Sequence, residues 1–473
     1  MERASAWAVP MRARVELQVL VELGGPLIVA VMSSVGLSLT ELAVAGHLGT
    51  PEYTAVAFAQ LVLDFTLVVF AQGFNKGLVA LAAQAYGAHN HELIGQYTQL
   101  TAVGLTLLCA PIGLLWYSCC GLLGAAGVSA RSVELAALYA RASITGLWPR
   151  LMFDALAASF QAQQLAAPAA VASAVAVAGN AFLSVLLAFG LPAAGVPGLG
   201  LLGCAVAMVL TQYARLGGYL WHMHRTHATM ALWHWRRPSH RHLRALVVVG
   251  APLMLGELFE NLQFQTMAVF AALLGETALA AHNTTLQVVF FFSSPIYGLH
   301  DAGVSRIGMY LGAGHADAAA YVSRVVLAAA VGTSVVVAGP WILARYAIGA
   351  IFSRDAEVGA LIASVTLLAA TGYIALSLFF YAMATLSAQA RAVPIMTSFV
   401  CGAWFVGVPA AYVLSQWQGM GLLGIWSGMA LGYAITTAIG VYYAGLSDWP
   451  KEAAKAVARS QTASVPEATP LLL

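Results

Sequence analysis

Charged side chains are scarce in this sequence. Asp, Glu, Lys and Arg make up 8% of its 473 residues, whereas 60% of the residues are hydrophobic. So little charge cannot cover the surface of a soluble globular protein of this length, so we expect lipid to cover most of the chain. Lysine occurs only at Lys76, Lys451 and Lys455, and none of them belongs to a G-x-x-x-x-G-K-[ST] phosphate loop. The chain therefore carries no ATP-driven motor of that kind.

Catalytic and metal-binding motifs are also missing from the sequence. It contains no G-x-S-x-G turn and no H-E-x-x-H helix, which disfavours a hydrolase that acts within the membrane. Its five cysteines lie in or beside apolar runs without the spacing of metal ligands, and we interpret them as packed thiols. We therefore expect a protein that is not an enzyme and that holds no cofactor and no metal ion.

Long apolar runs are what the sequence has in abundance. Broken by turn residues and charges, they predict an all-α polytopic membrane protein with twelve transmembrane helices. Several runs exceed the roughly 20 residues that cross a bilayer, which permits tilt. The expected spans are residues 17–46, 54–84, 97–120, 132–163, 167–190, 201–222, 243–272, 280–305, 321–346, 359–386, 394–416 and 420–445.

The two halves of the chain repeat each other. Gly24-Gly25-Pro26-Leu27 recurs as Gly250-Ala251-Pro252-Leu253, and Ala162-Gln163 recurs as Ala388-Gln389, in both cases 226 residues later. Six spans per repeat give two lobes of the same orientation, related by an axis along the membrane normal. We predict an N-terminus (1–16), an N-lobe (17–222), a basic linker (223–242), a C-lobe (243–445) and a tail (446–473).

Basic residues between the spans predict the orientation. With an even number of spans, both ends of the chain lie on the same side. Fourteen Arg and Lys residues fall on that side, against three (Arg131, Arg345 and Arg354) on the other. The positive-inside rule therefore places both termini, the linker and the tail in the cytoplasm.

Acidic residues within the spans are the first candidates for function. Glu260 lies in the apolar run Ala245–Leu274, whose only other acid is Glu257. A carboxylate at this depth is costly to keep, so we expect its charge or its proton to be used. The two acids share a helix face with Asn261 and partly with Gln265. Two carboxylates so close in a low dielectric do not easily both ionise, which suits exchange of a proton for a cation.

The alternative for this pair is a structural contact with a basic residue on another helix, such as Lys76. Other charges within the spans invite the same interpretation. We expect structural ion pairs or side chains that reach a helix end at Asp64, Lys76, Asp154 and Arg215. His300 and Asp301 lie at the cytoplasmic end of the eighth span, where we expect a solvated helix end; a gate contact is the alternative.

Five short motifs occur in order along the chain. They are Ala45-Gly46-His47-Leu48-Gly49, Gln84-Ala85-Tyr86-Gly87-Ala88, Phe160-Gln161-Ala162-Gln163, Leu311-Gly312-Ala313-Gly314 and Asp448-Trp449-Pro450-Lys451-Glu452-Ala453. This ordered set resembles the multidrug and toxic compound extrusion (MATE) family of antiporters, and the tail motif looks like that of eukaryotic members. The resemblance implies twelve helices in two lobes, and export of organic cations or metabolites in exchange for protons or sodium.

Matching to the family also points to individual residues. Glu260, eight residues after Pro252, matches the acid of the seventh helix in eukaryotic members, but their second acid is Gln265 here. Glu41 matches an acidic position in the first helix of bacterial members, and Asn180 matches a position near that acid. The alternatives are a Glu41 that reaches the outer headgroups and an Asn180 that only makes an interhelical hydrogen bond.

We interpret the chain as a secondary antiporter that exports organic cations or amphiphilic metabolites in exchange for protons by alternating access. The proton/substrate-binding candidates are Glu260, Glu257, Gln265, Asn261, Glu41 and Asn180. Sodium coupling, a lipid-type flippase of the wider superfamily, and a passive channel or scaffold are the alternatives. We expect a small organic substrate and the lipid bilayer as partners, no nucleic acid, and no need for an oligomer.

The sequence indicates two alternatives for the membrane in which the protein resides. Glu467 and Leu471-Leu472 fit an acidic dileucine pattern in the tail, of the kind that directs proteins to endolysosomal or vacuolar membranes. A short pattern of this type arises easily by chance. We therefore expect either the plasma membrane or an endolysosomal or vacuolar membrane.

Overall fold

The computed structural model describes residues 13–118, 129–191, 196–226, 239–352 and 356–461. Its first half is helical apart from one short pair of antiparallel strands, β1 (Gly190–Leu191) and β2 (Val196–Pro197). Helices α2 and α3 form one span through the π-helical segment η2. The elements are α1 (Ala13–Leu48), α2 (Thr50–Leu67), η2 (Val68–Gln72), α3 (Gly73–Gly87), α4 (His91–Ser118), α6 (Ala130–Ala162), α7 (Ala167–Phe189) and α8 (Leu201–Arg225).

The second half repeats this plan. Its eleventh span runs from Ala392 to Trp417 and contains two π-helical segments, η5 and η6. The elements are α9 (His240–Leu273), α10 (Glu276–Gly312), α11 (Ala316–Leu343), α12 (Arg345–Phe352), α13 (Ala356–Ala388), α14 (Ala392–Phe399), η5 (Val400–Gly407), α15 (Val408–Tyr412), η6 (Val413–Trp417), α16 (Gly421–Gly445) and α17 (Trp449–Ser460).

Twelve long helical spans thus occupy the described ranges. Ten of them are long and apolar enough to cross a membrane by length and composition. The other two, α6 and α10, have 33 and 37 residues and pack among the ten. The prediction of an all-α membrane protein with twelve spans is confirmed.

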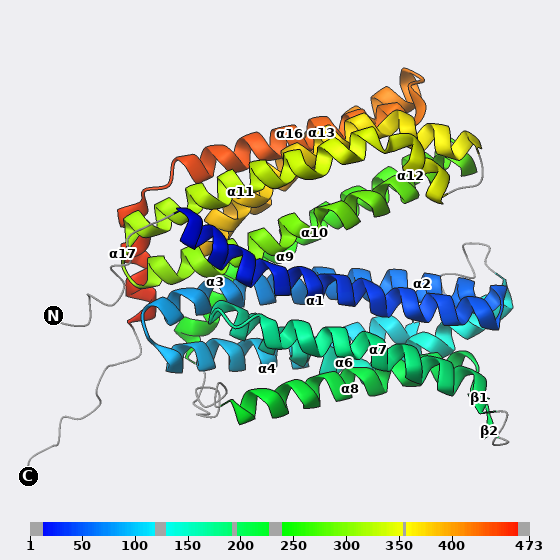
Figure 1. The fold of residues 1–473 in the computed structure, drawn as a ribbon, viewed down its shortest axis with the longest axis horizontal. Coiled ribbons are helices and arrows are strands. Elements are labelled where there is room, and N and C mark those ends of the chain that lie inside the picture. The colour runs from blue at the N-terminus through cyan, green and yellow to red at the C-terminus, as the bar shows by residue number, and fades with distance from the viewer. Residues whose placement is uncertain (1–12, 119–128, 192–195, 227–238, 353–355, 462–473) are drawn as a thin grey trace, which may run out of the picture.

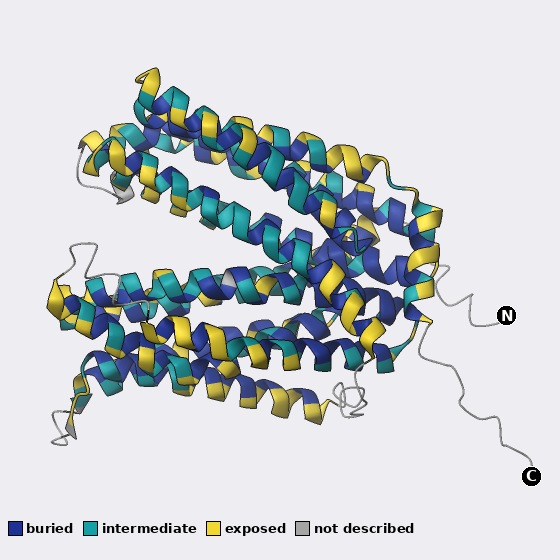
Figure 2. Ribbon diagram, turned by 180° about the vertical axis from the view of Figure 1, so that it is seen from behind, coloured by how far each residue is buried: buried dark blue, intermediate teal, exposed yellow. Residues whose placement is uncertain are grey.

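The spans form two lobes, one from α1 to α8 and the other from α9 to α16 (Figure 1). The lobes meet at the end that holds both termini and α17, where α1 packs on α10 and α3 packs on α9 and α10. They diverge toward the end that holds the β1–β2 pair and α12. Figure 2 shows the same arrangement from behind, with buried residues gathered where the lobes meet.

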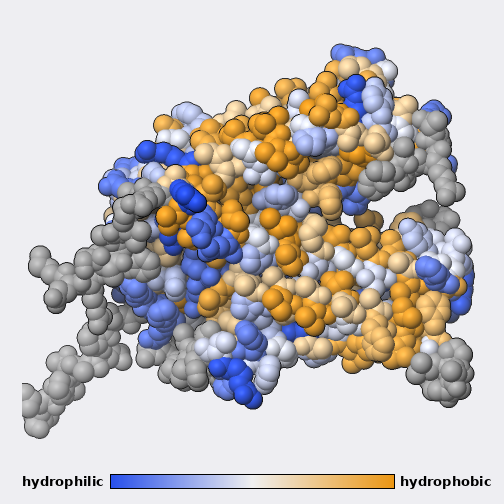
Figure 3. Space-filling view, in the orientation of Figure 1, coloured by the Kyte–Doolittle hydropathy of each residue, from blue (hydrophilic) through white to orange (hydrophobic). Residues whose placement is uncertain are grey.

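The sides of the lobes are apolar. Figure 3 shows hydrophobic residues over the flanks and hydrophilic ones toward the end that holds the termini. Large side chains that are exposed there include Leu107 at 70%, Val336 at 71% and Phe405 at 73%. In water such a surface would cause aggregation, whereas a bilayer covers it without cost.

Glycines let the lobes approach closely, and two of them begin the repeated motif. A Cβ on Gly24 of α1 would lie 3.2 Å from the carbonyl oxygen of Gly298 on α10. A Cβ on Gly77 of α3 would lie 3.0 Å from Cα of Gly250 on α9. Gly24 and Gly250 are equivalent in the repeat, so the same close packing occurs on both sides of the interface between the lobes.

Residues 449–460 of the predicted tail form a helix that contacts both lobes. Helix α17 begins where the Asp448 side chain accepts a hydrogen bond from the Lys451 amide, with Pro450 in the first turn. Arg459 donates to the Gln84 side chain of the N-lobe at 3.2 Å and to the Gln389 carbonyl oxygen of the C-lobe at 3.1 Å. The helix therefore bridges the lobes at the end where they meet. The dileucine pattern at 467–472 lies outside the described residues.

Candidate functional site

Glu260 lies inside the C-lobe. It is half-buried on α9, and the hydroxyl of Tyr433 on α16 donates a hydrogen bond to its Oε1 at 3.1 Å. The carboxylate lines a cavity of about 30 Å³, together with Phe264, Tyr297 and Trp426. A cavity needs roughly 10–15 Å³ on this measure to hold one water molecule. In this conformation the Glu260 cavity therefore has room for a few water molecules or a small hydrated ion.

Glu257 faces the other way. Its carboxylate forms an ion pair with Lys76 on α3, so the pair joins the two lobes. Lys76 is the basic residue named above as a structural partner for the acids of α9. It pairs with Glu257 and not with Glu260. The two acids are three residues apart, yet they have different partners in different lobes.

The remaining α9 candidates do not converge on Glu260. The Asn261 side chain donates back to the Glu257 carbonyl oxygen at 2.8 Å, within its own helix. Gln265 is exposed. The structure therefore brings only Glu260 to the C-lobe cavity and leaves Glu257, Asn261 and Gln265 outside it.

Glu41 is fully buried in the N-lobe. Its Oε2 accepts hydrogen bonds from the Tyr139 hydroxyl and, at 3.4 Å, from the Gln60 amide, whereas its Oε1 has no hydrogen-bond partner among the described residues. It lines a cavity of about 40 Å³ beside the ion pair of Asp64 and Arg150, whose atoms lie 3.2 Å apart. The alternative in which Glu41 reaches the headgroups is wrong, because this side chain is 0% exposed.

Asn180 is also buried but does not line the Glu41 cavity. The Thr211 hydroxyl of α8 donates to its Oδ1 at 3.2 Å, and its Nδ2 has no partner in the described part of the chain. The interhelical hydrogen bond that the sequence offered as an alternative is therefore present between α7 and α8.

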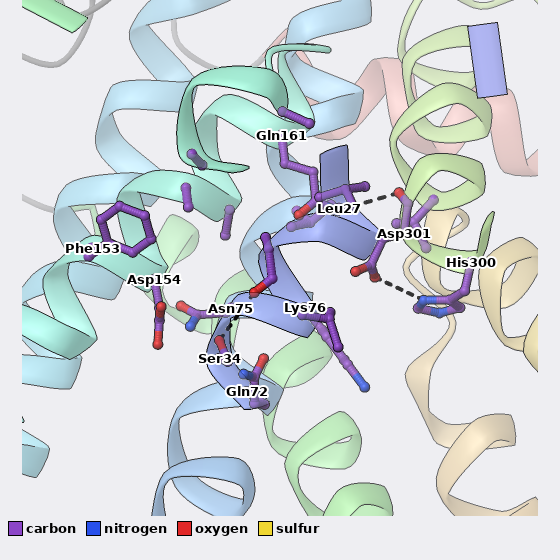
Figure 4. Close-up of a pocket in the computed structure, with 18 of the residues that line it drawn as sticks. Leu27, Ser34, Gln72, Asn75, Lys76, Phe153, Asp154, Gln161, His300 and Asp301 are labelled. Carbon is purple, nitrogen blue, oxygen red and sulfur yellow. Dashed lines mark hydrogen bonds and ion pairs between the residues drawn. The ribbon is translucent and has the colours of Figure 1, made fainter. Parts of the chain in front are cut away.

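A third and larger cavity, of about 180 Å³, lies between the lobes near the end where they meet. Figure 4 shows Asp154 and Asn75 on one side of it and Asp301 and His300 on the other. Lys76 also lines it. The cavity therefore draws charged side chains from both lobes.

One prediction about these charged residues is corrected here. His300 is only 4% exposed and bonds Asp301 at 2.9 Å, so the predicted solvated helix end is wrong. The reason is that α10 continues to Gly312, well past the predicted end at 305. Asp64 has the expected ion pair with Arg150. Arg215 interacts electrostatically with Asp154, and it also donates to Ser173 at 2.7 Å and lies over the Phe153 ring.

The sequence did not single out the tyrosines that hold the two acids. Tyr139 and Tyr433 lie far along the chain from Glu41 and Glu260, and the chain has 17 tyrosines. Within the described ranges, no group of three or more His, Cys, Asp or Glu side chains could hold a metal ion.

Comparison with known proteins shows which family has this architecture. A family model described as MatE matches residues 26–186 and matches again at residues 252–413. The chain belongs to the MatE family. The second match begins 226 residues after the first, which is the offset of the repeated motifs. Members of the MatE family are integral membrane transporters of small organic molecules and not enzymes, which confirms those parts of the interpretation.

Relatives within the MatE family cover nearly the whole chain. A probable multidrug resistance protein NorM of Bradyrhizobium diazoefficiens is 29% identical over 89% of this chain and 90% of its own length. Protein DETOXIFICATION 16 of Arabidopsis thaliana is 26% identical over 93% of this chain and 90% of its own. The resemblance inferred from the motifs is confirmed.

Solved structures of MatE transporters share the fold. The crystal structure of the eukaryotic MATE transporter AtDTX14 superposes with a TM-score of 0.86 at 22% identity, over 95% of this chain and 99% of that one. The Vibrio cholerae MATE transporter VcmN in its bent form gives a TM-score of 0.81 at 18% identity, over 95% and 99%. Both matches include the two lobes.

Proposed function

We propose that this MatE transporter is an antiporter that exports organic cations or amphiphilic metabolites in exchange for protons by alternating access. The observation that carries the proposal is the half-buried carboxylate of Glu260, held by Tyr433 in a cavity of about 30 Å³. A lone carboxylate at bilayer depth is a group that can take and release a proton.

The lining of this cavity supports protons over sodium as the driving ion. A sodium site needs several oxygen ligands around one point. The oxygen ligands that α9 offered for such a site diverge, because Glu257 pairs with Lys76 and Asn261 bonds its own helix. Beside Glu260, the cavity is lined mainly by aromatic and aliphatic side chains.

The small size of the cavity separates the roles of proton and substrate. A cavity with room for only a few water molecules is small for an organic cation, so we infer that the substrate reaches the acid when the lobes change their relative position. If both termini are cytoplasmic, the described conformation is closed toward the cytoplasm, because the lobes meet at the end that holds the termini. Glu41, in the N-lobe cavity, is the candidate for a second ion site.

A lipid-type flippase is the weaker alternative. A site for lipid phosphate calls for available Arg or Lys side chains. The Lys and Arg side chains at the cavity between the lobes are Lys76, which pairs with Glu257, and Arg215, which donates to Ser173, covers Phe153 and interacts electrostatically with Asp154. Both cations therefore already have an acidic neighbour inside the protein.

The test is exchange in proteoliposomes. The purified protein is reconstituted and loaded with a radiolabelled tetraalkylammonium cation, and efflux is measured with and without an imposed pH gradient. Gradient-driven efflux that stops when a protonophore collapses the gradient supports the proposal. Movement of a labelled phospholipid between leaflets, without cation efflux, would replace it with the flippase.

A further inference from the structure

The ion pair between Lys76 and Glu257 crosses the interface between the lobes. Lys76 belongs to α3 of the N-lobe and Glu257 to α9 of the C-lobe, and their side chains are 23% and 10% exposed. The pair lies beside two close approaches of these helices, where Gly73 faces Met254 and Gly77 faces Gly250. Any motion that parts the lobes at this end must therefore break the pair.

Breaking the pair leaves two charges without partners. In the described conformation the Lys76 ammonium balances Glu257, one turn from Glu260. When the lobes part, Glu257 loses its cation at a depth where an unpaired carboxylate is unfavourable. Binding a proton would neutralise the Glu257 carboxylate in place of the Lys76 ammonium.

We propose that Lys76 is a tethered cation that neutralises Glu257 only while the lobes are closed at the end that holds the termini. Opening at that end then requires Glu257 to take up a proton, and closing requires it to give the proton back. This inference rests on the proposed antiport, and it adds a reason why the carrier does not open at that end without a proton on Glu257. Lys76 acts as a positioning residue for the exchange.

Other titratable groups lie near Lys76 and enter the design of the test. The Lys76 ammonium also interacts electrostatically with the carboxylates of Glu260 on α9 and Asp301 on α10. His300 on α10, Asp154 on α6 and Arg215 on α8 line the cavity that Lys76 borders. Any of these acids or His300 could give a conformational change its own pH dependence, so the experiment must keep them in place.

The experiment measures conformation without transport. Spin labels at exposed Thr226, directly after α8, and at exposed Asp317 on α11 measure the separation of the lobes by double electron–electron resonance, in the full-length protein in nanodiscs. The variants are Lys76→Gln, Glu257→Gln and the double variant. Lys451→Gln, which removes an exposed lysine of α17, is the matched control.

Three results are expected. In the wild type and in the control, lowering the pH from about 8 to about 6 raises the ratio of open to closed molecules, by at most about tenfold per pH unit for one proton. Each single variant opens at both pH values, because it leaves one charge unpaired. The double variant, which has neither charge, closes again and shows no rise at low pH.

Two results would overturn the proposal. Persistence of the wild-type pH dependence in the double variant would assign it to Glu260, Asp301, Asp154 or His300 and reduce the pair to a structural contact. Unchanged lobe separation in both single variants would show that the pair does not hold the closed state. Absence of exchange by the wild type in proteoliposomes would instead contradict the proposed function, and the label distances would still test the pair.

Discussion

Tyr433 on α16 donates a hydrogen bond of 3.1 Å to Glu260 on α9, so the acid of the seventh span is held by the last span of the same lobe. The tyrosine ring is buried and also stacks near Phe264. A hydroxyl that donates to a carboxylate stabilises its charged form. The affinity of Glu260 for a cation or proton therefore depends on the position of α16.

Replacing Tyr433 by Phe should weaken this control while leaving the ring in place. A hydrogen bond to a charged group contributes about 1.5–3 kcal/mol, so the pH at which exchange is half-maximal should shift upward, because the charged form of Glu260 loses support. The pH profile of exchange by Tyr433→Phe measures the shift. Tyr412→Phe, on the same lobe but away from Glu260, is the control, and identical profiles for both variants would contradict the assignment.

Glu41 should contribute to a second ion site in the N-lobe. Its cavity is lined by Tyr139, whose hydroxyl donates to Glu41, and by the Asp64–Arg150 ion pair, so binding of an ion at Glu41 would act on charged and polar neighbours. Glu41→Gln should change the pH dependence or the apparent substrate affinity at an unchanged protein level, as measured by exchange at several pH values. A wild-type profile at wild-type abundance would make Glu41 a structural acid.

Arg306 should stabilise the closed end of the transporter. Its guanidinium donates two parallel hydrogen bonds, of 2.9 and 3.0 Å, to the buried Glu16 on α1, which also accepts one from Tyr310 at 2.7 Å. Arg306→Ala leaves Glu16 buried without its cation, which costs about 3–5 kcal/mol. Thermal unfolding in detergent should show a clearly lower Tm. The same change at exposed Arg324 should have little effect, and equal losses would contradict this role.

The sequence predicted the fold well because its main signals are local. A long apolar run predicts a membrane-crossing helix whatever packs against it, and the repeated Gly-x-Pro-Leu motif predicted the two lobes. The span whose C-terminal end was placed furthest from its position in the structure is α10, predicted to end at 305 and observed to end at Gly312. His300 and Asp301 bond each other and line the cavity between the lobes, so these polar residues do not mark a helix end and α10 continues past them.

The partners of the acids could not be predicted in the same way. Glu257 and Glu260 are three residues apart, which turns them by about 60° around a helix. That spacing suggested a shared site, but α9 lies in the C-lobe at its interface with the N-lobe, and the turn is enough to direct Glu257 to Lys76 and Glu260 to Tyr433. Only the packing of helices distant in sequence decides this, and the sequence does not report how α9 is rotated against them.

The most direct test of the account is efflux driven by a proton gradient in the absence of sodium on both sides of the membrane. Wild-type protein in proteoliposomes should export a labelled tetraalkylammonium cation under this gradient. Glu260→Gln, which fixes a neutral side chain, should reconstitute normally and show no gradient-driven efflux. Full transport by Glu260→Gln, or strict dependence of the wild type on sodium, would contradict the assignment of Glu260 as the proton-exchanging acid.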